Sequence, residues 1–169
     1  MLALARQFID IALLRAKPQD LPADTGVLVL AVCFALFTFL VASLPEAEPG
    51  MALQRALLDL VVTGLFIYGG LLYQRRVSRF TQAFSALAGA GAVINLAAAV
   101  VTAGLRPGEQ ASTLVMVLSL LLLAWSLALC AHVFRHTFTV SAPAGALIAL
   151  VYVIIALQIS HLLYPSGAA

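Results

Sequence analysis

Five polar side chains stand within otherwise apolar segments, and they are the residues best suited to bind a ligand or a proton. They form two pairs with helical spacing, Arg55 with Asp59 and Gln158 with His161, and one isolated amide, Asn95. Side chains three or four residues apart lie on the same face of a helix. A carboxylate inside a membrane costs roughly 2.5–3.5 kcal/mol on insertion scales, so it is expected to face polar partners. These residues therefore suggest a polar intramembrane site.

A structural interpretation of the same residues stays open. Arg55 and Asp59 can form an ion pair at a membrane boundary, and Asn95 can donate a hydrogen bond to a neighbouring helix. Hydrogen bonds between membrane helices contribute about 0.6 kcal/mol on average. In this interpretation the polar residues hold the helices together and bind no ligand.

Histidine and cysteine offer little for metal binding. His132 and His136 are four residues apart and close to Cys130, a spacing that can place two imidazoles on one metal ion. No third ligand lies nearby in the sequence, so we expect no metal site and no cofactor. Cys33 and Cys130 both lie within apolar segments, which predicts two buried thiols rather than a disulfide.

Enzyme motifs are absent from the chain. It contains no glycine-rich phosphate loop, HExxH, CxxC or GxSxG pattern. Of its seven acidic residues only Asp59 lies well inside an apolar segment, which leaves no catalytic carboxylate pair. We therefore expect a protein that is not an enzyme.

Composition identifies the elements that must position these residues. Of the 169 residues, 63% are hydrophobic and 9% are charged, against about 45–50% and 25% in soluble domains. A chain of this length cannot bury so much apolar surface in water. Disorder and nucleic-acid binding are excluded as well, because the chain is neither polar nor densely basic. The composition predicts an all-α integral membrane protein.

Charged residues divide the chain into five segments long enough to cross a membrane, since about 20 apolar residues are needed. The sequence predicts one membrane domain over residues 1–169, a bundle of five transmembrane helices at about 25–44, 53–73, 81–104, 111–133 and 143–164. The second segment is the weakest, because Arg55 and Asp59 interrupt it. Arg55 can extend to the interface, which would place both residues near the outer end of that helix.

A short amphipathic helix is predicted before the first membrane segment, within residues 1–17. Leu4, Phe8 and Ile11 repeat at helical spacing, which is typical of a helix lying on the cytoplasmic membrane surface. The alternative is a short frayed tail. Further along, Ser85 and Gly89 are four apart in a segment rich in small residues, which predicts a central packing helix of one subunit rather than a dimer contact.

The distribution of basic residues predicts the orientation. Seven lie on one side of the predicted membrane: Arg6, Arg15, Lys17, Arg75, Arg76, Arg79 and Arg135. The other side has two, Arg55 and Arg106, together with Glu46, Glu48 and Glu109. Basic residues accumulate in cytoplasmic loops. We therefore expect a cytoplasmic N-terminus and an outer C-terminus, with the five polar residues in the outer half.

The arginines Arg75, Arg76 and Arg79 form a short basic loop between the second and third segments. Such a loop contacts anionic lipid headgroups, and it is also a candidate docking site for a cytoplasmic partner.

The complete layout resembles the Yip-domain (Ypt-interacting protein) family of small five-span membrane proteins. The stretch WSLALCAHVFRH over residues 125–136 resembles the fourth span of bacterial members, and residues 8–22, FIDIALLRAKPQDLP, resemble their opening segment. The resemblance implies a five-helix protein of a bacterial inner membrane with a cytoplasmic N-terminus, and it assigns no site residue.

Together these observations favour a non-enzymatic membrane scaffold or adaptor. Its expected partners are membrane lipids, other membrane proteins or a second copy of the chain, and not nucleic acid. The alternative is a small oligomeric transporter or channel with an outward-facing polar site around Asp59 and Asn95.

Overall fold

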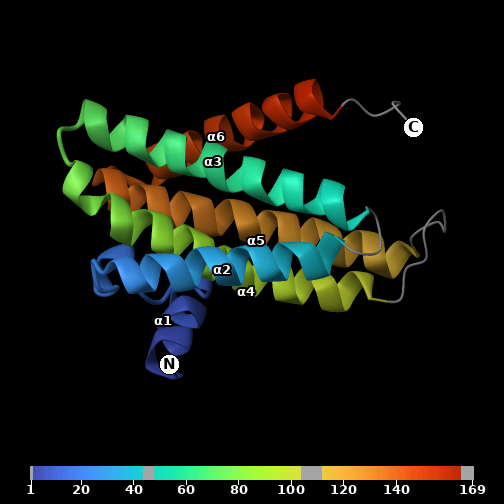
Figure 1. The fold of residues 1–169 in the computed structure, drawn as a ribbon. Helices are drawn as coiled ribbons and strands as arrows, with labels where there is room; N and C mark the ends of the chain where they lie inside the picture. The colour runs from blue at the N-terminus through green and yellow to red at the C-terminus, as the bar shows by residue number, and fades with distance from the viewer. Residues whose placement is uncertain (1, 44–47, 104–111, 165–169) are drawn as a thin grey trace.

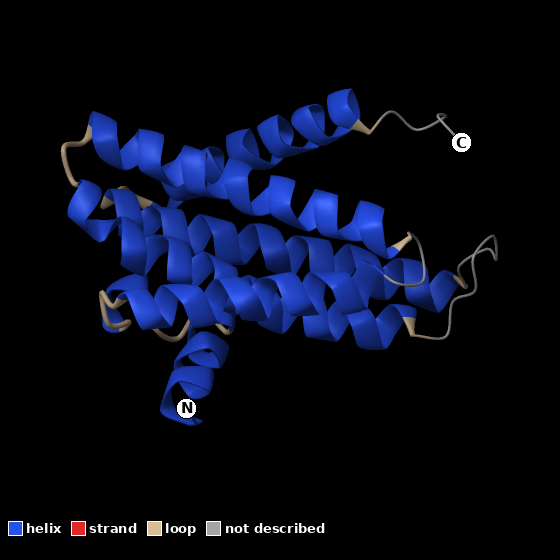
Figure 2. Ribbon diagram, viewed as in Figure 1, coloured by secondary structure: helices blue, strands red, loops and turns tan. Residues whose placement is uncertain are grey.

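The computed structural model describes residues 2–43, 48–103 and 112–164, and within these ranges the chain forms helices and turns and no strand (Figure 2). The five long helices are α2 (Thr25–Ser43), α3 (Pro49–Tyr73), α4 (Phe80–Thr102), α5 (Thr113–Phe138) and α6 (Ala142–Leu163). Each belongs to a helical segment long and apolar enough to cross a membrane. The all-α prediction with five such helices is confirmed for the described residues.

Local sequence signals explain where several helices begin and end. Pro49 starts α3 and Pro143 stands in the first turn of α6, positions where a missing backbone N–H costs nothing. The Ser112 hydroxyl accepts a hydrogen bond from the Val115 amide at 3.3 Å and caps α5. Thr139, with φ of 56°, ends α5 in the left-handed conformation.

Two helix boundaries differ from the predicted ones by more than about two residues. Helix α3 begins at Pro49 instead of residue 53, so Asp59 lies about 15 Å along it, near its middle. Asp59 is therefore deeper than the predicted outer end. Helix α5 continues to Phe138 instead of residue 133, and His136 is still helical. The predicted helix ends at residues 44, 104 and 111, and the charges at Glu46, Arg106 and Glu109, lie outside the described residues.

Helix α4 is the centre of the bundle. It packs against α1 (Leu2–Ala12), α2, α3 and α5, and its closest neighbour, α2, runs beside it in the same direction (Figure 1). Small side chains allow this, since Ser85, Gly89 and Ala92 are among ten buried residues of α4. The structure thus gives the small-residue segment the central packing role that the sequence predicts.

Two turns at one end of the bundle are joined by hydrogen bonds. The short helix η2 (Val77–Arg79) precedes α4, and its turn lies beside the turn between α5 and α6. Gln74 Nε2 donates to the Phe138 carbonyl oxygen at 3.1 Å. Arg76 Nη1 and Arg79 Nη1 donate to Thr139 Oγ1 at 3.0 and 3.1 Å. We call this end, with Arg75, Arg76, Arg79 and Arg135, the basic end.

Helix α1 crosses the bundle instead of running along it (Figure 1). The Phe8 ring lies against Gly89 of α4, and Trp125 Nε1 of α5 donates to the Ala12 carbonyl oxygen at 2.7 Å. Past α1, a ring nitrogen of His132 lies 2.9 Å from the Ala16 carbonyl oxygen. The predicted apolar face of this helix therefore packs against protein.

The two cysteines differ in their surroundings. Both are free thiols, as predicted, but only Cys130 is buried, and Cys33 is exposed on α2. The prediction of two buried thiols is wrong for Cys33, because its position on α2 faces away from the neighbouring helices.

Candidate functional site

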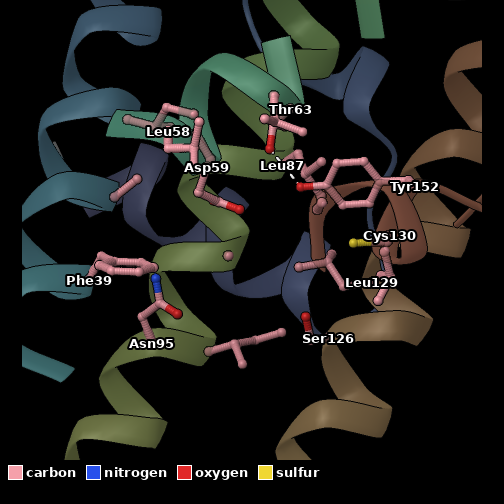
Figure 3. A pocket seen from close by; sticks show the side chains of 18 of the residues that line it. Phe39, Leu58, Asp59, Thr63, Leu87, Asn95, Ser126, Leu129, Cys130 and Tyr152 are labelled. Carbon is pink, nitrogen blue, oxygen red and sulfur yellow. Dashed lines mark hydrogen bonds between the residues drawn. The ribbon is translucent and has the colours of Figure 1, made fainter. Parts of the chain in front are cut away.

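A cavity of about 400 Å³ lies between all five long helices, and we call it the central cavity. Most of its lining is apolar, including Leu58, Leu87 and Leu129 (Figure 3). The polar side chains that line it come from four helices: Arg55, Asp59 and Thr63 from α3, Asn95 from α4, Ser126 from α5, and Tyr152 and Ser160 from α6. Because Asp59 and Tyr152 lie near the middle of their helices, the cavity reaches the centre of the bundle.

The Asp59 carboxylate faces the central cavity, and no residue of the described ranges forms an ion pair or hydrogen bond with it. Its side chain is exposed, and no Arg55 nitrogen lies within 4.0 Å of its oxygens. In the described part of the chain, Arg6 and Asp10 form an ion pair at 3.9 Å, whereas Arg55 and Asp59 do not. The interpretation of Arg55 and Asp59 as a boundary ion pair is therefore wrong.

Asn95 also faces the cavity, where its amide lies next to Phe39 (Figure 3). It is half-buried, and no hydrogen bond joins it to another described residue. The predicted hydrogen bond between Asn95 and a neighbouring helix is thus absent from residues 2–43, 48–103 and 112–164. Its amide can instead donate to, and accept from, a molecule inside the cavity.

A hydrogen bond between two hydroxyl groups closes one wall of the cavity. Thr63 Oγ1 and the Tyr152 hydroxyl oxygen are 2.7 Å apart, and both residues are buried. The Tyr152 ring packs between Phe66 and Phe134, with centroids 5.2 and 5.4 Å away. Sequence reasoning missed this contact, although a tyrosine in the middle of an apolar segment, far from the interface that tyrosines favour, was a signal.

A second pocket of about 530 Å³ adjoins the central cavity at the end of the bundle opposite the basic end, and we call it the mouth pocket. It is lined by Arg55, Leu157, Gln158, Ser160, His161 and Tyr164. Arg55, Leu157 and Ser160 line both spaces, so the two are neighbours. Gln158 and His161 are exposed, so the mouth pocket is open at the surface of the bundle.

Arg55 is held in the mouth pocket by an aromatic ring. Its guanidinium carbon lies 5.4 Å from the centroid of the Tyr164 ring, a distance at which a cation is attracted to the ring face. Its Nε is enclosed and has no hydrogen-bond acceptor among the described residues, to which its two Nη atoms donate no hydrogen bond either. The guanidinium is therefore positioned by Tyr164, and its Nη atoms can donate to another molecule.

The structure brings the five predicted polar residues into these two adjoining spaces. Arg55, Asp59 and Asn95 line the central cavity, while Gln158 and His161 line the mouth pocket together with Arg55. The residues missed by sequence reasoning are Thr63, Ser126, Cys130, Tyr152 and Ser160, all in apolar segments.

The remaining candidate residues lie away from these spaces. The rings of His132 and His136 are 4.6 Å apart near the basic end, and the described residues contain no group of three His, Cys, Asp or Glu able to hold a metal ion. Arg76 and Arg79 are engaged with Thr139, and Arg75 is exposed.

The arrangement can bind a small molecule. One carboxylate, one guanidinium, two amides and several hydroxyl groups surround two adjoining spaces whose walls are otherwise apolar. Ligand sites in proteins share this design, in which a few polar groups orient a ligand in an apolar pocket.

No protein-family model, curated protein or solved structure matches this chain. The resemblance to the Yip-domain family therefore stays a prediction.

Proposed function

We propose that this protein is an integral protein of a bacterial inner membrane, and that it acts as a small transporter. It takes a small ligand from the outer side, through the mouth pocket, into the central cavity. It performs no covalent chemistry on the ligand. Association with further copies of itself would supply the additional helices that a conduction path needs.

Exposed apolar side chains support insertion into a membrane. Large hydrophobic residues are exposed along the long helices, with Leu114, Leu120, Leu147 and Leu157 each more than 60% exposed. Water-soluble monomers do not expose such continuous apolar surfaces. Lipid chains would cover them.

The basic end supports the orientation with the N-terminus in the cytoplasm. Both described turns between long helices that lie there carry arginine, Arg75, Arg76 and Arg79 in one and Arg135 next to the other. With the basic end in the cytoplasm, the mouth pocket faces outward and the C-terminus lies outside.

The observation that carries the transporter proposal is the unpaired carboxylate of Asp59 near the middle of the bundle. A charge at this depth is costly, and such residues commonly belong to the path of a substrate or ion. A purely structural acid would pair with Arg55, one helical turn away, and it does not.

Thiol accessibility tests this proposal. In a chain with Cys33→Ser and Cys130→Ser, a single cysteine is placed at Asn95, which lines the cavity, or at Val100, which is 78% exposed on the same helix. Only a thiolate reacts, and it forms only in contact with water. A membrane-impermeant thiol reagent added outside should modify Asn95→Cys and leave Val100→Cys unmodified in lipid.

The proposal fails if Asn95→Cys is as unreactive as Val100→Cys. Equal and fast modification of both variants would contradict membrane insertion of α4. An Asp59→Asn variant that folds and labels normally but no longer accumulates a transported solute would locate the function at the carboxylate.

A second candidate function is that of a scaffold for other membrane proteins, and exposed Arg75 favours it. Arg75 adopts φ of 57° at the end of α3 and points into solvent at the basic end. Native mass spectrometry of nanodiscs cut from the native membrane would detect a stoichiometric partner protein. The partner should disappear in Arg75→Glu, and a symmetric homo-oligomer without partner would overturn the scaffold proposal.

A further inference from the structure

We infer that the ligand of this site is a zwitterion, with an ammonium group at Asp59 and an anionic group at Arg55. The inference rests on the proposed function and adds the chemical class of the ligand. The observation behind it is that two opposite charges four residues apart on one helix form no ion pair with each other: both line the central cavity, and Arg55 also lines the mouth pocket.

The central cavity is suited to a cation. Its two charged lining residues are Arg55, which it shares with the mouth pocket, and Asp59. The neutral polar groups of its lining supply oxygen atoms that accept hydrogen bonds: Asn95, Ser126 and the Thr63–Tyr152 pair. An ammonium group donates three hydrogen bonds and accepts none. It therefore matches a carboxylate surrounded by acceptors.

The mouth pocket is suited to an anion. The Arg55 guanidinium lies over Tyr164, and within the described ranges no acceptor binds its Nη donors. Gln158, Ser160 and His161 add donors on the α6 side of the same pocket. A carboxylate or phosphate binds such a group of donors strongly, because charge-assisted hydrogen bonds are roughly twice as strong as neutral ones.

The spacing of the two charges limits the ligand. Residues four apart on a helix have Cβ atoms about 5–6 Å apart. A ligand with an ammonium and an anion separated by a few methylene groups spans this distance, and its methylene groups meet the apolar lining formed by Leu58 and Leu157. Two sources have this chemistry: a free amino acid-like solute and the headgroup of phosphatidylethanolamine.

Binding of a matched series of probes tests the inference. The protein is placed in nanodiscs of phosphatidylglycerol, which has no ammonium group, and titrated with 6-aminohexanoate, hexylamine and hexanoate. The zwitterion should bind at least about tenfold more tightly than either single-charge probe. A tenfold ratio of Kd corresponds to about 1.4 kcal/mol, which the second charged contact would contribute. Equal affinity for hexylamine and 6-aminohexanoate, or no binding of 6-aminohexanoate, in these nanodiscs of phosphatidylglycerol would overturn the inference.

Variants assign each charge to its residue. Arg55→Gln should reduce 6-aminohexanoate affinity to that of hexylamine, and Asp59→Asn should reduce it to that of hexanoate. Arg15→Gln, an exposed residue outside both spaces, is the control and should change neither. If Arg55→Gln leaves the preference intact, the anionic group does not bind at Arg55 and the inference is wrong.

Addition of phosphatidylethanolamine to the nanodiscs distinguishes the two sources. If the lipid competes with 6-aminohexanoate, or is itself retained in native mass spectra and lost in Asp59→Asn, the ligand is a lipid headgroup. If it does neither while the soluble zwitterion binds, the ligand is a free solute. Asn95→Cys labelling without any zwitterion preference would refute this inference and leave the proposed function standing.

Discussion

The hydroxyl pair of Thr63 and Tyr152 joins α3 to α6 beside the central cavity, and it is the contact whose energy can be tested most directly. Tyr152→Phe keeps the packing between Phe66 and Phe134 but leaves the Thr63 hydroxyl buried without its partner. Interhelical hydrogen bonds in membranes contribute about 0.6 kcal/mol on average and about 1.7 at most. Tyr152→Phe should therefore lower the free energy of unfolding in micelles by about 0.6–1.7 kcal/mol.

The double variant Thr63→Val with Tyr152→Phe is the matched control. Replacing both partners by apolar groups of similar shape removes the unsatisfied hydroxyl, so its stability should return toward that of the native protein. A double variant less stable than Tyr152→Phe alone would mean that the hydroxyl pair is not the origin of the loss.

The identity of the site residues could be predicted from the sequence more reliably than their positions along the helices. Arg55, Asp59 and Asn95 were identifiable because polar side chains are rare in apolar segments, and all three line one cavity. The depth of Asp59 was missed because Arg55 was used to place the helix start, although Pro49 is a helix-start residue. The Thr63–Tyr152 contact joins residues 89 positions apart in the sequence, and local sequence patterns do not predict contacts between such distant residues.

At the scale of elements, the packing of α1 against α4 requires a glycine at position 89. A Cβ at Gly89 would collide with the Phe8 ring, so Gly89→Ala should displace Phe8 and loosen α1 from α4. Limited trypsin digestion in nanodiscs should then cut after Arg6 and Arg15 faster than in the native protein. Gly69→Ala, where an added Cβ meets nothing within 4 Å, should digest at the native rate. Unchanged cleavage in Gly89→Ala would show that Phe8 does not hold α1.

The contact between α5 and α6 depends on a second glycine near the basic end. A Cβ at Gly145 would lie 2.9 Å from the Ala131 carbonyl oxygen, and backbone must move to make room. Overpacking of this kind costs about 1–3 kcal/mol. We expect Gly145→Ala to lower the free energy of unfolding by that amount in a denaturant titration, whereas Gly69→Ala should be neutral or slightly stabilising.

The existence of the five long helices followed from the sequence, because charges and prolines interrupt the apolar segments, whereas the start of α3 and the end of α5 did not. The sequence did not indicate whether lipid or another helix covers the apolar face of each helix. Leu4, Phe8 and Ile11 share a face of α1 in sequence and structure alike, but hydrophobic spacing does not distinguish a lipid surface from the groove beside Gly89. Packing partners are set by residues distant in the chain.

At the scale of the whole molecule, the basic end predicts the topology. Alkaline phosphatase, which is active only outside the cytoplasm, should be active when fused after Tyr164 and inactive when fused before Leu2. A green fluorescent protein fusion should give the opposite pattern. Activity at the N-terminal fusion would invert the orientation and place the mouth pocket in the cytoplasm.

The parallel contact between α2 and α4 has a consequence for how the chain assembles during synthesis. Among the five long helices α2 is synthesised first and its principal neighbour α4 third, whereas α3, which comes between them, contacts α2 less extensively. A nascent chain ending after Tyr73 thus holds two helices without the surface that α2 needs. The contact between α2 and the small-residue face of α4 can form only after α4 has been synthesised. Until then, the translocation machinery or lipid must cover the apolar surface of α2 and α3.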